Sequence, residues 1–369
     1  MPYSLENIPF STLNTLNSFT PLEYCYPKSL TSLTLMVSID LVHVFIGLPP
    51  GLRDLTIYSD DYMLEQPFVT RRLPAGLKVL NLYCGFNQTI TKDLFPPSIE
   101  FILFGGRFNK PITELPASAT HLSFGNQFAQ EFDHQPVRNL WINNPLTFKH
   151  DMVFDNLNVM TATQANPEFI RQLSSTTFPN LERLQLLEDS LTDPIALPME
   201  MPSLRLLLCS IQGPITQFPQ DIDELDLGCA PSQLLTPSLL PSSLQSLVLR
   251  DYKHVIKVGD IPSSVTLLGL YSVAHLPEQG TLPSALRSLI LEGEASTEYV
   301  AATLANQSLV NITVHQQVYG TFVFHYELNL FRISDNMFFN HPQNNLSKYG
   351  FIHRDNILAL HAKKNRHHQ

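Results

Sequence analysis

The sequence holds few residues whose types and spacing could support catalysis or metal binding. The string HRDN at 353–356 matches the start of a protein-kinase catalytic loop, which also needs an Asn five residues after its Asp; position 360 is Leu. The glycine-rich loop, the strand lysine motif and the D-F-G triplet of those enzymes are missing too. His367 and His368 form a terminal pair of a kind that is usually solvated. With no Ser-His-Asp or Cys-His signature, we predict no catalytic residue, no cofactor and no metal site.

The cysteines are scattered, and none forms a CxxC pair. This spacing argues against a zinc ribbon or a disulfide scaffold and favours a reducing compartment. We see no signal peptide at the N-terminus and no stretch near the roughly 18 apolar residues that a membrane helix needs. We therefore expect a cytoplasmic protein whose cysteines are mostly small core residues. The four are Cys25, Cys84, Cys209 and Cys229.

Composition limits the classes of protein that fit this chain. Hydrophobic residues make up 44% of 369 positions and charged residues 15%, which allows a sizeable core and argues against disorder. The net charge of −10 argues against a nucleic-acid or anionic-membrane binder, because such proteins need a basic face. The length fits two or three domains, or one long repeat array.

A repeat favours the array. The segment LPPGLRDLTI at 48–57 is echoed by LPAGLKVLNL at 73–82, and the shared unit is a proline, one or two small or polar residues, then L-x-x-L-x-L. Counted from its first Leu, the anchor, units recur about every 22 residues. One interval is about twice as long, and a decayed unit fits inside it at Phe154, Leu157 and Val159, making roughly fourteen units. The other anchors are Leu30, Leu52, Leu77, Ile99, Ala119, Val137, Leu181, Leu204, Ile222, Leu244, Val265, Leu286 and Leu309.

Within a unit, apolar residues at anchor +3 and +5, such as Leu80 and Leu82, alternate with variable residues at +2 and +4. That alternation predicts a short strand, which cannot bury its face alone and must stack on its neighbours. The proline suits the bend before the strand, since it fixes φ and donates no hydrogen bond. With Phe154 as the anchor of the decayed unit, Asn156 and Asn158 occupy its +2 and +4 positions. We predict a repeat solenoid: one curved array with short parallel strands on the concave face and mostly irregular turns on the convex face.

Three units share a second string after the strand. Residues 85–90 read GFNQTI, 105–112 read GGRFNKPI and 125–129 read GNQFA. With L-P-x-S-L ahead of it, the string F-N-x-P-I is similar to the FNIP repeat, a leucine-rich-repeat-like family expanded in social amoebae and in giant viruses of amoebae. The resemblance covers about residues 27–315 and is sharpest from Leu73 to Ile112, whereas the F-N element is gone after about residue 220.

The residues of this second string have structural roles that can be read directly. We expect the Phe at +9 to stack as an aromatic ladder along the core, and the Asn at +10 to bond the backbone of neighbouring coils. A Gly at +6 allows a turn with positive φ. These residues are Phe86, Phe108 and Phe128, then Asn87 and Asn109, then Gly105 and Gly125.

The ends of the chain depart from the repeat. We expect residues 1–26 to be an N-terminal capping segment, 27–315 the solenoid, 316–358 a C-terminal cap and 359–369 a disordered tail. Within the cap, 316–326 should form one more strand or a hairpin. Many FNIP-repeat proteins carry an F-box ahead of the repeats, and nothing in 1–26 resembles one.

The exposed face of the sheet is the best candidate for a binding site. Residues at +2 and +4 line it, and the single Trp, Trp141, shares it with Phe101, Leu103, His121 and Asn81. Because aromatic side chains carry much of the energy at protein interfaces, we predict that these five residues bind a partner protein. The alternative is that flanking loops or the C-terminal segment cover the patch.

The predicted function is a non-catalytic scaffold for protein–protein interaction, with no nucleic-acid or membrane partner. One alternative is a substrate receptor of a ubiquitin-ligase complex, recruited through a separate adaptor. Another is an enzyme with its site in the C-terminal segment, which would need a cleft formed by His325, His341 or His353.

Overall fold

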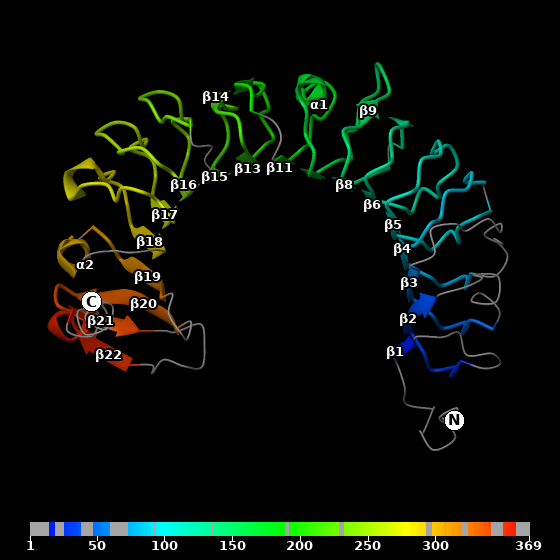
Figure 1. Cartoon of the computed structure of the whole chain (residues 1–369), viewed down its shortest axis with the longest axis horizontal. Coiled ribbons are helices and arrows are strands. Elements are labelled where there is room, and N and C mark those ends of the chain that lie inside the picture. The colour runs from blue at the N-terminus through cyan, green and yellow to red at the C-terminus, as the bar shows by residue number, and fades with distance from the viewer. Residues whose placement is uncertain are drawn as a thin grey trace. The chain divides into compact units, whose positions relative to one another are not determined.

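The chain forms two compact units, Met1–Glu182 and Arg183–Gln369 (Figure 1). In each unit the strands lie along the inner side of the coils and the connecting turns lie on the outer side (Figure 1). A computed structural model describes residues 15–18, 26–37, 47–59, 73–91, 93–134, 136–188, 192–228, 232–292, 297–306, 308–318, 324–340 and 350–358.

The first unit is a stack of short parallel strands, each paired with the next in chain order. The pairing joins equivalent repeat positions, so that Val79 lies opposite Phe101, which lies opposite His121. The strands are β1 (Thr15–Ser18), β2 (Ser32–Val37), β3 (Asp54–Ser59), β4 (Val79–Tyr83), β5 (Phe101–Phe104), β6 (His121–Phe124), β8 (Asn139–Ile142) and β10 (Val159–Ala162).

The outer side of the first unit is mostly irregular, as predicted, with two regular pieces. β7 (Glu131–Phe132) pairs in parallel with β9 (Thr147–Phe148). Helix α1 (Pro167–Gln172) begins at the N-cap Asn166, whose Oδ1 accepts a hydrogen bond from the Phe169 N–H at 2.8 Å. The Gln172 side chain, in turn, donates to the Leu146 carbonyl and accepts from the Phe148 N–H, joining this helix to β9.

In most units the proline lies in the bend before the strand, as predicted. The Leu77 N–H donates to the Pro74 carbonyl at 3.0 Å, and the same bond joins Leu52 to Pro49 at 3.1 Å. Proline therefore supplies the acceptor that closes the turn and keeps its missing N–H out of the sheet ladder.

Burial follows the repeat positions. The anchor Leu77 and the +3 and +5 residues Leu80 and Leu82 are fully buried. Phe108 stacks on Phe86 and on Phe128, with ring centroids 5.7 Å apart in both pairs, which confirms the predicted aromatic ladder. Offset stacks at such distances stabilise a pair beyond the area it buries. The solenoid of the first unit is therefore held by a column of rings between its sheet and its outer turns.

The asparagines at +10 bond the next coil, as predicted. Asn87 Oδ1 accepts from the Asn109 N–H at 2.9 Å, and Asn109 Oδ1 accepts from the Ala129 N–H at 3.0 Å and from Gln130 Nε2 at 2.9 Å. These side chains satisfy backbone donors at the point where the chain leaves the sheet.

Replacing Asn109 with alanine is expected to lower the free energy of unfolding by about 1 kcal/mol, because the Ala129 N–H loses its acceptor. Urea denaturation followed by circular dichroism measures the change. Asn109→Asp keeps an oxygen at the same position and should lose less; an equal loss in both variants would contradict the role of this acceptor.

The prediction of positive φ at Gly105 and Gly125 was wrong. Among the described glycines only Gly47 and Gly259 have positive φ. Gly105 and Gly125 are required because coils approach closely: a Cβ on Gly105 would lie 2.4 Å from the Leu82 carbonyl oxygen, and one on Gly125 would lie 2.4 Å from the Gly106 Cα. The glycines leave room for the backbone of the preceding coil.

The register of the decayed unit was also predicted wrongly. Its anchor is Leu157, fully buried, and the Leu157 N–H donates to the Phe154 carbonyl at 3.2 Å. Phe154 therefore occupies the place that proline has in most other units. The +2 and +4 residues of this coil are Val159 and Thr161, which lie opposite Asn139 and Trp141 on β8, and not Asn156 and Asn158.

The second unit begins with the same kind of stack. Its parallel strands pair in chain order, and each ladder joins equivalent repeat positions. They are β11 (Arg183–Glu188), β13 (Leu206–Ile211), β15 (Glu224–Gly228), β16 (Ser246–Arg250), β17 (Leu267–Tyr271), β18 (Ser288–Glu292) and β19 (Asn311–Val318). Outside this stack lie the pair β12 (Ile195–Ala196) and β14 (Ile215–Gln217), the 3-10 turn η3 (Gln279–Thr281) and helix α2 (Thr297–Ala305).

Antiparallel strands close the second unit. β20 (Phe324–Ser334) pairs with β19, and Gln316 lies opposite Tyr326, which confirms the predicted hairpin. β21 (Met337–Asn340) and β22 (Gly350–His353) extend it. β19 runs through position 315, so the change from repeat to hairpin occurs within one strand. In the described ranges, no helix is both long and apolar enough to cross a membrane.

Candidate functional site

The predicted site lies on the strand face of the first unit. β5 contributes Phe101 and Leu103, β6 contributes His121 and β8 contributes Trp141, and the four side chains line one pocket of about 630 Å³. We call it the strand-face pocket. Its other lining residues are Tyr83, Leu122, Ser123, Asn139, Leu140, Asn143, Val159 and Thr161.

Asn81, the fifth predicted residue, does not line this pocket. It lies on β4, and its Nδ2 donates to Thr56 Oγ1 on β3 at 3.0 Å. The hydrogen bond joins equivalent +4 positions of adjacent coils. The Asn81 side chain therefore bonds a neighbour on the face of the sheet.

The hollow arises from side-chain size at anchor +6. Tyr58 and Tyr83 occupy this position on β3 and β4 and stack with ring centroids 4.7 Å apart and planes 4° from parallel. The next two coils carry Gly105 and Gly125 there, and the coil after them carries Asn143. Two coils that have glycine at +6 therefore separate the Tyr58–Tyr83 stack from Trp141 on the other side of the pocket.

Trp141 forms the opposite wall and is held in place. Its Nε1 donates to Asn143 Oδ1 at 3.0 Å, and the same oxygen accepts from Thr163 Oγ1 at 3.0 Å. The indole is still 48% exposed, and Tyr83 is 44% exposed. The described residues thus leave the pocket open, with a large aromatic side chain whose orientation is set before anything binds.

The strand-face pocket contains no carboxylate, lysine or arginine. Its polar groups are amides and hydroxyls, together with the imidazole of His121, whose Nδ1 lies 2.9 Å from Thr120 Oγ1. The chemistry that such a lining offers is burial of uncharged surface with a few hydrogen bonds at the margin.

The predicted site left out eight of the residues that line this pocket, among them Tyr83, Asn143, Val159 and Thr161. Tyr83 and Asn143 lie at +6, where the alternation of large and absent side chains could have revealed them. Val159 and Thr161 were missed because the decayed unit was counted from Phe154, which shifted its register by three residues.

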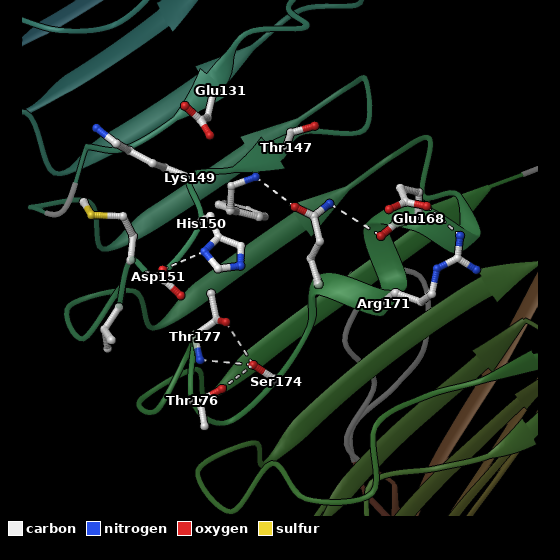
Figure 2. Close-up of a pocket in the computed structure, with 14 residues that line it drawn as sticks. Glu131, Thr147, Lys149, His150, Asp151, Glu168, Arg171, Ser174, Thr176 and Thr177 are labelled. Carbon is white, nitrogen blue, oxygen red and sulfur yellow. Dashed lines mark hydrogen bonds and ion pairs between the residues drawn. The ribbon is translucent and has the colours of Figure 1, made fainter.

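A second pocket, also of about 630 Å³, lies on the outer side of the first unit beside β9 and α1 (Figure 2). We call it the turn-side pocket. The lining of this pocket is more polar than that of the strand-face pocket and includes charged side chains. Its lining includes Glu131, Thr147, Lys149, His150, Asp151, Glu168, Arg171, Ser174, Thr176 and Thr177.

The basic side chains of the turn-side pocket are already neutralised. Arg171 pairs with Glu168 at 2.6 Å, and Lys149 pairs with Asp133 at 3.2 Å. Figure 2 shows the Ser174 hydroxyl bonded to its own neighbours, at 2.9 Å from the Thr177 hydroxyl. These groups satisfy one another, so the pocket presents no unpaired cation that would select an anionic ligand.

The described thiols are core residues. Cys84 and Cys209 are free and buried, and burial raises the pKa of Cys84 to about 11 and that of Cys209 to about 12. Both therefore stay protonated at neutral pH, and a buried, protonated thiol is a poor nucleophile. Cys25 and Cys229 lie outside the described residues.

Of the three histidines proposed for a C-terminal cleft, the structure describes the side chain of His353 alone. His353 Nδ1 lies 3.4 Å from Asp355 Oδ2 near the surface. His341, His367 and His368, like the side chain of His325, lie outside what the structure describes. Among the described residues, no group of three or more His, Cys, Asp or Glu side chains could hold a metal ion.

Comparison with protein families identifies the repeat. The FNIP Repeat model matches residues 65–107, 86–127 and 231–272, so the chain carries FNIP repeats in three places. The third match lies in the second unit, and its residues contain no F-N string. A search of the curated proteins found no match.

A solved structure shows the same fold. CroV588, described as a novel circular LRR (leucine-rich-repeat) protein, aligns with a TM-score of 0.53 and 22% identity over 86% of this chain. The chain spans 55% of the length of CroV588. YopM from Yersinia enterocolitica WA-314 aligns over 76% of this chain and 63% of its own, with a TM-score of 0.38 and 17% identity. The chain is a parallel-strand solenoid of the leucine-rich-repeat type.

Proposed function

We propose that this FNIP-repeat solenoid is a non-catalytic scaffold that binds a partner protein on the strand face of its first unit. The observation that carries the proposal is the strand-face pocket: it is open, uncharged and walled by Tyr83 and Trp141. Solenoids use their inner surface for binding, and partly exposed aromatic side chains are the residues that most often dominate an interface.

The properties of the wall support binding of a protein. The Tyr58–Tyr83 stack and the hydrogen-bonded Trp141 hold three aromatic rings at the surface in fixed orientations. Ordering such rings before association reduces the entropy that binding costs. These rings are exposed and lie outside the core, which is formed by the inward +3 and +5 residues and the ring column at +9.

Other features support a scaffold working in the cytoplasm. Leucine-rich-repeat-like solenoids are generally non-catalytic, and the described thiols are buried and free, as in proteins of reducing compartments. The partner is proposed to be protein, since the strand-face pocket has no basic side chain to neutralise phosphate groups.

Affinity purification with mass spectrometry tests the proposal. Wild-type protein is compared with a variant carrying Trp141→Ala and Phe101→Ala, after both have shown the same melting temperature. We expect partners of the wild type to be lost from the double variant, because both large apolar anchors of the pocket are removed.

Val153→Ala is the matched control. Val153 is 44% exposed and lies in the turn-side pocket of the same unit, so its truncation removes apolar surface away from the strand face. Partners should be retained by this variant. Retention of every partner by the double variant would place the binding surface elsewhere.

A further inference from the structure

The strand-face pocket is shaped for side chains that project from a larger body. Its volume of about 630 Å³ exceeds what one side chain fills, while the exposure of Tyr83 and Trp141 shows that both walls open to solvent. Sites for free small molecules bury most of the ligand surface, which an open hollow on a sheet does not do. Side chains of a protein segment suit it better, since the backbone of the segment stays outside.

The two aromatic walls of the pocket, Tyr83 and Trp141, indicate that the bound segment inserts more than one apolar side chain. Leu103, Ser123 and Trp141 are directly opposite one another on β5, β6 and β8, so Ser123 lies on the floor between a leucine and the indole. Strands lie about 4.8 Å apart, and the coils that carry Tyr83 and Trp141 are three steps apart, so the walls are roughly 14 Å apart along the stack. Side chains on one face of an extended segment lie about 6.6 Å apart, so two of them fit between the walls, one against each wall.

The charge of Arg138, beside the pocket, sets a second requirement on the partner segment. Arg138 is exposed and immediately precedes Asn139, a lining residue. Its backbone bonds Thr120 on one neighbouring coil and Asn158 on the other, both uncharged, and within the described residues its guanidinium forms no ion pair. Lys78, in the same +1 row, is by contrast paired with Glu100 at 2.6 Å. Arg138 therefore carries an exposed cation one residue away from the lining of the pocket.

We infer that the strand face takes an extended segment of a partner protein that carries two apolar side chains and a carboxylate beside them. The apolar pair fills the uncharged hollow between Tyr83 and Trp141, and the carboxylate faces Arg138. This inference rests on the proposed function and specifies the chemistry of the partner. A cation at the edge of an apolar site selects among partners and speeds their encounter more than it adds affinity.

A library of random peptides displayed on phage tests the inference. The library is selected on the full chain after depletion on Ser123→Phe, a variant in which the new ring fills the floor of the hollow. We expect the enriched peptides to share two apolar residues with an adjacent Asp or Glu. Binding of the synthetic peptides is then followed by the fluorescence of Trp141, the single tryptophan of the chain and a wall of the pocket.

Arg138→Gln should weaken the best peptide about two- to fivefold at low salt, with the difference shrinking as salt is added. Arg53→Gln is the matched control: Arg53 is an exposed cation of the same +1 row, four coils away, roughly 19 Å. It should leave the affinity unchanged.

The outcomes separate the two claims. Peptides that need the open hollow but show no acidic residue and no response to Arg138→Gln would overturn the inference and leave the proposed function standing. Failure to select any peptide that distinguishes wild type from Ser123→Phe would overturn both. Self-association of the wild type in sedimentation, absent from Ser123→Phe, would make a second copy the occupant and overturn the inference.

Discussion

Replacing Phe108 with alanine is expected to lower the free energy of unfolding of the first unit by about 3–5 kcal/mol. The side chain is fully buried, and its ring lies 4.2 Å from that of Phe104 and 5.7 Å from those of Phe86 and Phe128. Truncation removes a large apolar group and leaves a cavity that three coils share. The stack can close only if several coils shift together, so little of the loss is recovered.

Urea denaturation measured by circular dichroism tests this expectation. Trp141→Ala is the matched control within the same unit, because it removes a larger aromatic ring that is 48% exposed. We expect that variant to lose less than about 1 kcal/mol, as surface substitutions usually do. Equal losses in the two variants would mean that the ring column contributes no more than the surface does.

Replacing Gly125 with alanine is expected to destabilise the first unit by about 1–3 kcal/mol or more. The new Cβ would lie 2.4 Å from the Gly106 Cα and 2.7 Å from the Gly105 carbonyl oxygen. These are backbone atoms of the preceding coil, so no side-chain rotation can relieve the overlap. The coils must separate, and the sheet bonds between them must lengthen.

The neighbouring Gly106 provides a strict control. A Cβ built there has nothing within 4 Å, and its φ is not in the left-handed region. Gly106→Ala should therefore be neutral, or stabilising by about 0.4–1 kcal/mol through the unfolded state. A melting temperature lowered equally by Gly106→Ala and Gly125→Ala would refute the argument from close approach.

The solenoid could be predicted from the sequence because one constraint is repeated many times. Every coil must bury +3 and +5 against its neighbours, so Leu80 and Leu82 have counterparts throughout the chain. Repetition also revealed the second string, in which Phe86, Phe108 and Phe128 stack as expected. Because many units share the pattern, a wrong assignment in one unit does not change the predicted fold. The solenoid could therefore be predicted despite the decayed coil.

The details of the site were less predictable, since they depend on departures from the repeat. The decayed coil has Phe154 where most other units have proline, so counting from apolar residues shifted Val159 and Thr161 off the face. At +6 the glycines were assigned to turn geometry, although their effect is to permit close packing and to leave the hollow open. A period indicates where side chains point, but the size of each side chain decides where a surface is concave.

The hydrogen bonds between coils have a consequence for how such a chain changes over generations. Asn87 accepts from the coil of Asn109, and Asn109 accepts from the coil of Ala129, so each of these two coils supplies an acceptor to the one that follows. An in-frame duplication of one coil brings its own donor and acceptor and can be inserted without redesigning its neighbours. The array therefore lengthens or shortens in whole steps, and the hollow moves along it with whichever copies carry glycine.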